Sequence, residues 1–194
     1  MNRKKKVLLT LLVVGVVLGL IALGVFSAFS ATTSNDNNNF RAGSVAISDN
    51  HSASALYDVT GAKPGDSSTA SCIKVTYTGS LGATVKLYRS AFTSGTGLDP
   101  YVNLALTKGT GNATDCSDFT PAGSGSSVYS GTLSALGTSY SSGSAVTLTN
   151  SSGSSTWSQN NAVTYKFVAT LADDNNANGK VTGTHSFTWE AQNN

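Results

Sequence analysis

Few side chains in this sequence are of the types that perform catalysis or bind metals. The 194 residues include two histidines, His51 and His185, and a single glutamate, Glu190. A catalytic zinc ion usually takes three protein ligands and works with a general base. The chain has no HExxH segment, and no spacing brings the two histidines together with an acidic residue. The sequence therefore does not favour a zinc hydrolase.

Other hydrolase signatures are also missing from the sequence. The chain is rich in serine but contains no GxSxG segment, which would place a nucleophile on a sharp turn. Asp173 and Asp174 are adjacent on one turn, so they cannot form the opposed carboxylate pair of a glycosidase. Glu190 follows Trp189 in an expected strand, and its side chain should point away from the Trp189 face. No catalytic residue is expected.

Residues 174–179 offer one weak calcium candidate. Asp174, Asn176, Asn178 and Gly179 fit the first half of an EF-hand-like loop, D-x-N-x-N-G. The twelfth position of such a loop should be a bidentate acid, and here it is His185. An Asn/Gly hairpin between two strands explains the same residues. The hairpin is the favoured interpretation, and no metal or cofactor is expected.

The two cysteines, Cys72 and Cys116, predict a structural disulfide. In the chain-entropy model, closing a loop of about 45 residues stabilises the fold by ~4 kcal/mol. A reactive thiol would need an activating neighbour, and the sequence offers none beside either cysteine.

The N-terminus has the pattern of a secretory signal peptide. A basic cluster at residues 3–6 precedes an apolar run over 7–26, and small residues follow. The run is long enough to cross a bilayer as a helix, so a retained anchor is the alternative. Glycines within the run and the lack of a following basic cluster favour cleavage. We expect the cut between Ser27 and Ala28, with a second possible site before Ala31.

These boundaries give a signal peptide over 1–27, a polar segment over 28–39 and one domain over 40–194. Without the basic residues at 3–6, the chain carries eight basic against ten acidic side chains, a net charge near −2. The basic character therefore belongs to the targeting segment, and no nucleic-acid surface is indicated. Contact with the membrane is expected only during export.

After residue 40 the sequence consists of short alternating runs separated by Gly, Ser, Thr, Asn and Asp. Such alternation is typical of half-buried strands. The clearest run covers residues 163–171, and the others lie at 45–47, 73–77, 85–87, 102–106, 146–148 and 187–191. No helix is expected after the signal. The pattern predicts an all-β fold, an antiparallel β-sandwich of Greek-key or jelly-roll type.

Two Ser/Gly-rich segments, residues 139–144 and 150–155, are interpreted as surface loops. Trp157, beside the second segment, is the one obvious candidate for an exposed aromatic platform. If it is exposed, the chain could serve as a monomeric adhesion or polysaccharide-binding module.

Several short motifs, in order, resemble the TasA/camelysin family of bacterial matrix-fibre proteins, which are exported with a SipW-type signal peptide. They are "ALG" at 22–24, "AFS" at 28–30, "NNFRAGSVAISDN" from Asn38, "KPGDS" at 63–67 and "FTWEAQ" at 187–192. The resemblance covers most of the chain. The Cys72–Cys116 pair and the short length depart from the founding fibre protein.

The resemblance implies a secreted jelly-roll protein that polymerises into filaments of the cell surface or biofilm matrix. Assembly in this family proceeds by donor-strand exchange, in which an N-terminal segment completes the sheet of the next subunit. The donor here would span residues 28–40, with Ala28 at its start and Phe29 and Phe40 as apolar anchors. The implied partners are further copies of the chain, an accessory matrix protein and a dedicated signal peptidase. Some family members are classed as metallopeptidases, so a camelysin-like peptidase is the enzyme alternative.

Overall fold

The computed structural model describes residues 2–24, 41–52 and 54–194. The chain divides into two compact units, Met1–Arg41 and Ala42–Asn194. The first contains α1 (Arg3–Gly24), which covers the basic cluster and most of the apolar run, and its apolar side chains between Val7 and Leu18 are exposed. Among the described residues, no helix combines the length and apolarity required to cross a membrane.

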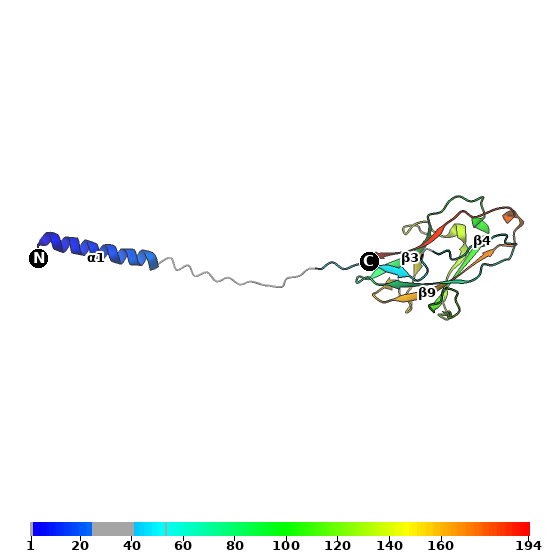
Figure 1. Cartoon of the computed structure of the whole chain (residues 1–194), viewed down its shortest axis with the longest axis horizontal. Helices are drawn as coiled ribbons and strands as arrows, with labels where there is room; N and C mark the ends of the chain where they lie inside the picture. The colour runs from blue at the N-terminus through cyan, green and yellow to red at the C-terminus, as the bar shows by residue number, and fades with distance from the viewer. Residues whose placement is uncertain (1, 25–40, 53) are drawn as a thin grey trace. The chain divides into compact units, whose positions relative to one another are not determined.

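The second unit contains two antiparallel sheets, and Figure 1 labels three of their strands, β3, β4 and β9. The first sheet, sheet A, has the order β1-β2-β9-β4-β5, with β6 also paired to β4. Its strands are β1 (Ile47–Asp49), β2 (Ser71–Tyr77), β9 (Ala162–Leu171), β4 (Val102–Thr110), β5 (Thr120–Pro121) and β6 (Ser127–Thr132). The long central strands β9 and β4 pair along eight residues, from Val102 opposite Leu171 to Gly109 opposite Thr164.

The second sheet, sheet B, is built around β3. Its order is β10-β3-β7, and β8 pairs with β3 on the same side as β7. The strands are β3 (Ala83–Ser90), β10 (Ser186–Asn193), β7 (Val146–Leu148) and β8 (Thr156–Trp157). All eight residues of β10 pair with β3, from Ser186 opposite Ser90 to Asn193 opposite Ala83. β10 is therefore an edge strand with one side unpaired within the described structure.

One hydrophobic core lies between the two sheets. Buried residues alternate along β3, where Ala83, Val85 and Leu87 face the core, and along β9, where Val163, Tyr165 and Phe167 do so. The apolar alternation in the sequence therefore places side chains of both sheets in the same interior. Every core residue that the structure describes lies within 42–194, so that unit has a hydrophobic core of its own.

The predicted all-β, antiparallel character is confirmed. The jelly-roll assignment is a finer statement and stays a prediction. Three strands were not expected from the sequence: β5, β6 and β8. The only helical segments in residues 42–52 and 54–194 are 3₁₀ turns: η1 (Asp99–Tyr101), η2 (Leu133–Ala135) and η3 (Asn175–Ala177).

Candidate functional site

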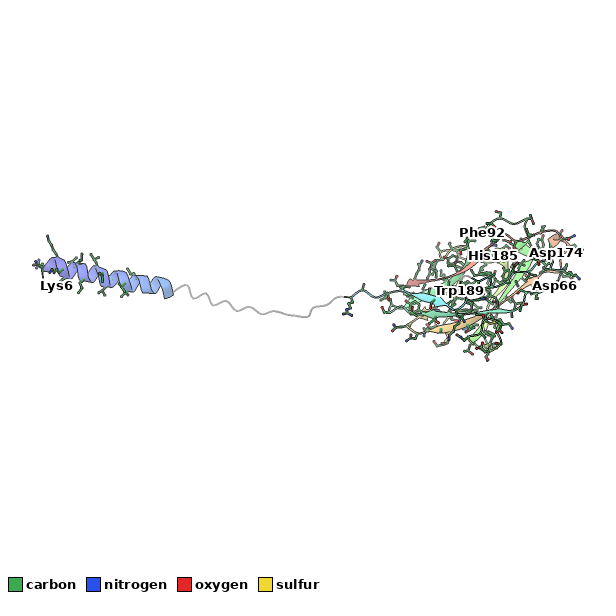
Figure 2. The ribbon with its side chains drawn as sticks, in the orientation of Figure 1. Lys6, Asp66, Phe92, Asp174, His185 and Trp189 are labelled. Carbon is green, nitrogen blue, oxygen red and sulfur yellow. A yellow bond between two sulfur atoms is a disulfide. The ribbon has the colours of Figure 1, made fainter. Side chains whose placement is uncertain are left out.

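A groove of about 1630 Å³ opens between the edge of sheet A at β1 and the edge of sheet B at β10. Its floor includes Ile73 and Val75 of β2, and its side includes Phe187 and Trp189 of β10. Residues 51–52 and 54–66, together with the loop at 174–185, complete its walls. In Figure 2, the labelled groove residues follow one another along the domain from Trp189 through His185 to Asp66 and Asp174.

The groove has an aromatic wall that the core supports from behind. Phe167, buried in β9, packs against both aromatic residues of β10, with ring centroids 5.2 Å from Phe187 and 5.8 Å from Trp189. Tyr57 also lies close to Phe187, with ring centroids 6.1 Å apart. Phe187 and Trp189 are only partly buried, so their apolar surface remains available to a further segment. The alternation at 187–191 predicted that Phe187 and Trp189 share one face of this strand, and both pack against the core.

One end of the groove is polar. The Nε2 atom of His185 lies 2.6 Å from the Tyr57 hydroxyl, and its Nδ1 atom lies 3.0 Å from the Gly183 carbonyl oxygen. A carbonyl can only accept, so Nδ1 carries the proton, and in neutral His185 the Nε2 atom accepts from the Tyr57 hydroxyl. Burial, and secondarily the nearby Asp99 carboxylate, raise the pKa of Tyr57, while Arg89 acts in the opposite direction. Tyr57 therefore stays protonated and available as a donor.

A buried ion pair supports this polar end. Arg89 lies near the C-terminal end of β3, on the buried face of the strand. Its side chain bonds to Asp99 of η1, and the residue is only 7% exposed. Its guanidinium also lies 4.7 Å from the ring centroid of Phe92. Arg89 can be buried next to the core because the carboxylate of Asp99 neutralises its charge.

The residues needed for a metallopeptidase do not converge in the described part of the chain. His51 and His185 both line the groove, yet no three His, Cys, Asp or Glu side chains among residues 2–24, 41–52 and 54–194 are placed to hold a metal ion. His51 donates its backbone N–H to Asp49, and its Nδ1 atom is buried without a hydrogen-bond partner. These side chains do not fit the ligand set of a zinc hydrolase.

The calcium candidate forms a self-contained turn. Asp174 caps η3, and its Oδ1 atom accepts hydrogen bonds from the backbone and side-chain nitrogens of Asn176, at 2.8 and 2.9 Å. Asn178 donates its backbone N–H to Asn175, and Gly179 follows at φ +69°. The expected hairpin is wrong, because β9 belongs to sheet A and β10 to sheet B, so the connection crosses between sheets. Calcium binding at this turn stays a weak and untested candidate.

The geometry supports the predicted disulfide. Cys72 and Cys116 are bonded, with Cα atoms 5.1 Å apart. The bond attaches the 111–118 loop to β2, where Cys72 is fully buried. No reactive thiol remains, since both cysteines are in the bond.

Trp157 does not provide the exposed platform considered for polysaccharide binding. It is 0% exposed and forms part of the core, and its Nε1 donates to the Leu148 carbonyl oxygen at 3.1 Å. That interpretation is therefore wrong. Alternation could not reveal this burial because β8 has only two residues.

The predicted cleavage site, Ser27 and Ala28, lies outside the described residues, as do the donor-strand residues Phe29 and Phe40. Sequence reasoning also missed Tyr57, because the surrounding "HSASALYDV" has no strand or helix periodicity. Its partner His185 is 128 positions away, so only the folded chain brings the two together.

Comparison with known proteins gives one family. Residues 2–93, which include β1, β2 and β3, match the family model described as camelysin metallo-endopeptidase, whereas β10 and His185 lie beyond the matched region. No curated protein matches the chain significantly. The match confirms, over residues 2–93, the resemblance to the TasA/camelysin family that the sequence motifs predicted.

Proposed function

We propose that this chain is a secreted structural protein of jelly-roll type that assembles into filaments at the bacterial cell surface or in the biofilm matrix. Assembly proceeds by donor-strand exchange, with residues 28–40 of one copy entering the groove of the next. The observation that carries this proposal is the unpaired outer edge of β10 beside a groove with an aromatic wall.

An added strand would gain two kinds of contact at this site. The eight residues of β10 bond to β3 on one side only, so their outward N–H and C=O groups can pair with an incoming backbone. Alternate side chains of that strand would point at Phe187 and Trp189. Main-chain bonds then supply affinity, and the aromatic wall selects apolar residues such as Phe29 and Phe40.

The family match supports a cell-surface protein, and the proposed partners are further copies of the chain together with an accessory matrix protein and a dedicated signal peptidase. We propose no enzymatic activity. The matched model carries the name of a metallo-endopeptidase, but the described His, Asp and Glu side chains do not assemble a metal site.

Electron microscopy of two purified forms tests this function. One form begins at Ala28 and the other at Arg41, so they differ in the proposed donor segment. We expect filaments from the first form and dispersed particles from the second. A matched variant of the longer form, Phe29→Ser, should shorten or abolish filaments, whereas Thr33→Ser, a conservative change in the same segment, should not.

If the two forms assemble equally, or if neither assembles, donation by residues 28–40 is wrong. Mixing the shorter form with a synthetic peptide of residues 28–40 separates docking from polymerisation. Saturable binding to the shorter form that Trp189→Ala weakens would locate the peptide in the groove.

A further inference from the structure

The chain enters the β-sheet domain beside the turn that joins β2 to β3. The Leu81 N–H of this turn donates to the Ser44 carbonyl oxygen at 3.0 Å. The C-terminus lies at the same place, where the Asn194 N–H donates to a carbonyl oxygen of the turn at 3.4 Å. Residues 43–46, the turn at 79–82 and the end of β10 therefore share one end of the domain, which we call the entry end. An N-terminal donor segment leaves the domain from this end.

The polar end of the groove lies at the opposite end of β10. This strand begins at Ser186, next to His185, and finishes at Asn193, which pairs with Ala83 at the entry end. Eight strand residues extend over roughly 25 Å, so the two ends of the domain are well separated. A donor segment therefore starts far from the polar end of its own groove.

Exposed apolar side chains lie at both ends of the domain. Within residues 42–52 and 54–194, the exposed large apolar side chains are Val45, Val59, Leu81, Phe92 and Val181. Val45 and Leu81 belong to the entry end. Phe92, which is 51% exposed, follows β3 at the polar end (Figure 2), and the Val181 carbonyl oxygen accepts from the Thr96 N–H in the loop after Phe92. Each end therefore presents apolar surface that a second copy can cover.

We propose that copies join head to tail, with the entry end of one copy packed on the polar end of the next, and that the inserted segment runs antiparallel to β10. This inference rests on the proposed function. The segment leaves the entry end of its own copy and meets the polar end of the next groove first, so residue 40 lies near His185 and residue 28 near Asn193. That direction is the reverse of β10, and antiparallel pairing is the more stable of the two.

The alternative is a contact between two entry ends. The segment would then run parallel to β10, and the second copy would insert its own segment into the first in the same way. Such a two-fold exchange closes as a pair and cannot grow. A contact between unlike ends leaves one free entry end and one free polar end, so further copies can be added.

The composition of the segment also fits the antiparallel direction. Residues 28–34 read "AFSATTS" and residues 35–39 read "NDNNN". The antiparallel direction sets the first group along Trp189 and the second at the polar end, where asparagine amides can donate to the carboxylates of Asp66 and Asp174. The parallel direction would set the asparagines against the aromatic wall, where their amides lack partners.

A spin-labelled peptide tests the direction of insertion. The recipient is the isotopically labelled form that begins at Arg41, and the probe is a synthetic peptide of residues 28–40 with a nitroxide at one terminus. A nitroxide at the N-terminus of the peptide should broaden the Asn193 amide resonance, and one at its C-terminus should broaden that of His185. The reverse pattern, or equal broadening by both peptides, overturns the antiparallel assignment.

A donor copy tests the contact between unlike ends. This copy begins at Ala28 and carries Trp189→Arg, which puts a charge on its aromatic wall, so that it inserts its segment but accepts none. Compared with the unlabelled peptide, the donor copy should shift the amide resonances of Phe92 and Val181 in the recipient. Additional shifts at Leu81 of the recipient, or none beyond those that the peptide causes, contradict the head-to-tail contact.

Two serine variants provide matched controls, because each can be placed on either copy. Phe92→Ser in the recipient should weaken binding of the donor copy roughly tenfold, since apolar contact is lost, and should leave peptide binding unchanged. Leu81→Ser should weaken binding when the donor copy carries it and not when the recipient does. The opposite dependence for Leu81→Ser would indicate a contact between two entry ends.

The two proposals fail in different ways. If neither the peptide nor the donor copy binds the recipient, the proposed function is wrong and the head-to-tail arrangement falls with it. If the peptide binds but the end contacts are missing, the head-to-tail arrangement alone is wrong. Should Trp189→Arg prevent folding, hydrogen exchange of filaments from the form that begins at Ala28 replaces it. Slower exchange around both Leu81 and Phe92 is expected, and slower exchange around Leu81 alone overturns the proposal.

Discussion

The two tryptophans lie on opposite sides of β3 and have different surroundings. Trp157, opposite Ala83, is fully buried and its indole N–H bonds to the Leu148 carbonyl oxygen. Trp189, opposite Leu87, is only partly buried, and its Nε1 atom has no hydrogen-bond partner. β7 and β8 are edge strands of sheet B, as β10 is, but the tryptophan on their side is fully covered within this chain. The tryptophan on the β10 side is not, so apolar surface remains exposed on that side of the sheet.

The largest expected difference between the two sides is in the cost of truncation. Trp157→Ala should lower the free energy of unfolding by about 3–5 kcal/mol, because it leaves a cavity in a closed core. Trp189→Ala should cost about 1–2 kcal/mol, because part of its surface is already exposed to solvent. Urea titration followed by circular dichroism measures both changes. Equal losses would mean that the β10 side is as complete as the β8 side.

A smaller effect concerns the indole N–H alone. Trp157→Phe should cost about 1–3 kcal/mol, since the buried Leu148 carbonyl oxygen loses its donor. Trp189→Phe removes a donor that has no partner, so its cost should stay within about 0.5 kcal/mol. The same urea titrations give both values, and a greater loss at Trp189 would show that its N–H is bonded in the folded protein.

The smallest effect is a pH dependence of the free energy of unfolding that arises from Tyr57, next to β10. Burial raises the pKa of Tyr57 above its ordinary value of about 10. Below that pH both the folded and unfolded chains hold the proton, so the contribution to stability is constant. Above it the unfolded chain releases the proton first, and the free energy of unfolding falls as pH rises.

Tyr57→Phe should make this alkaline fall shallower. The fall should not vanish in this variant, because burial also raises the pKa of Tyr165, which still contributes to the loss of stability at alkaline pH. Denaturant midpoints collected at a series of alkaline pH values provide the measurement. Identical slopes in wild type and variant would show that Tyr57 does not hold its proton more tightly in the folded state.

The strands with regular alternation were predictable because each has one buried face. The apolar positions of 163–171 correspond to the inward side of β9, and those of 73–77 to β2. By contrast, β6 reads "SVYSGT" and β8 has two residues, so neither carries a periodic signal. Their strand state comes from pairing with β4 and β3, which are distant in sequence.

The groove was only partly predictable, for the same reason. Alternation placed Phe187 and Trp189 on one face, but it could not show that the opposite edge of β10 lacks a neighbour. Nor could it show that loop 111–118 covers β2, because those contacts depend on how the chain closes. Local patterns determine which side chains turn inward, whereas long-range pairing determines which edges remain open.

The pairing of β10 with β3 also has a consequence for the order of events during synthesis. β3 ends at Ser90, and its partner begins at Ser186, so a chain that has not yet delivered residues 186–193 lacks one wall of the groove. Contacts of such high sequence separation form late. If the proposed function holds, incomplete chains therefore lack the site that would receive a donor strand.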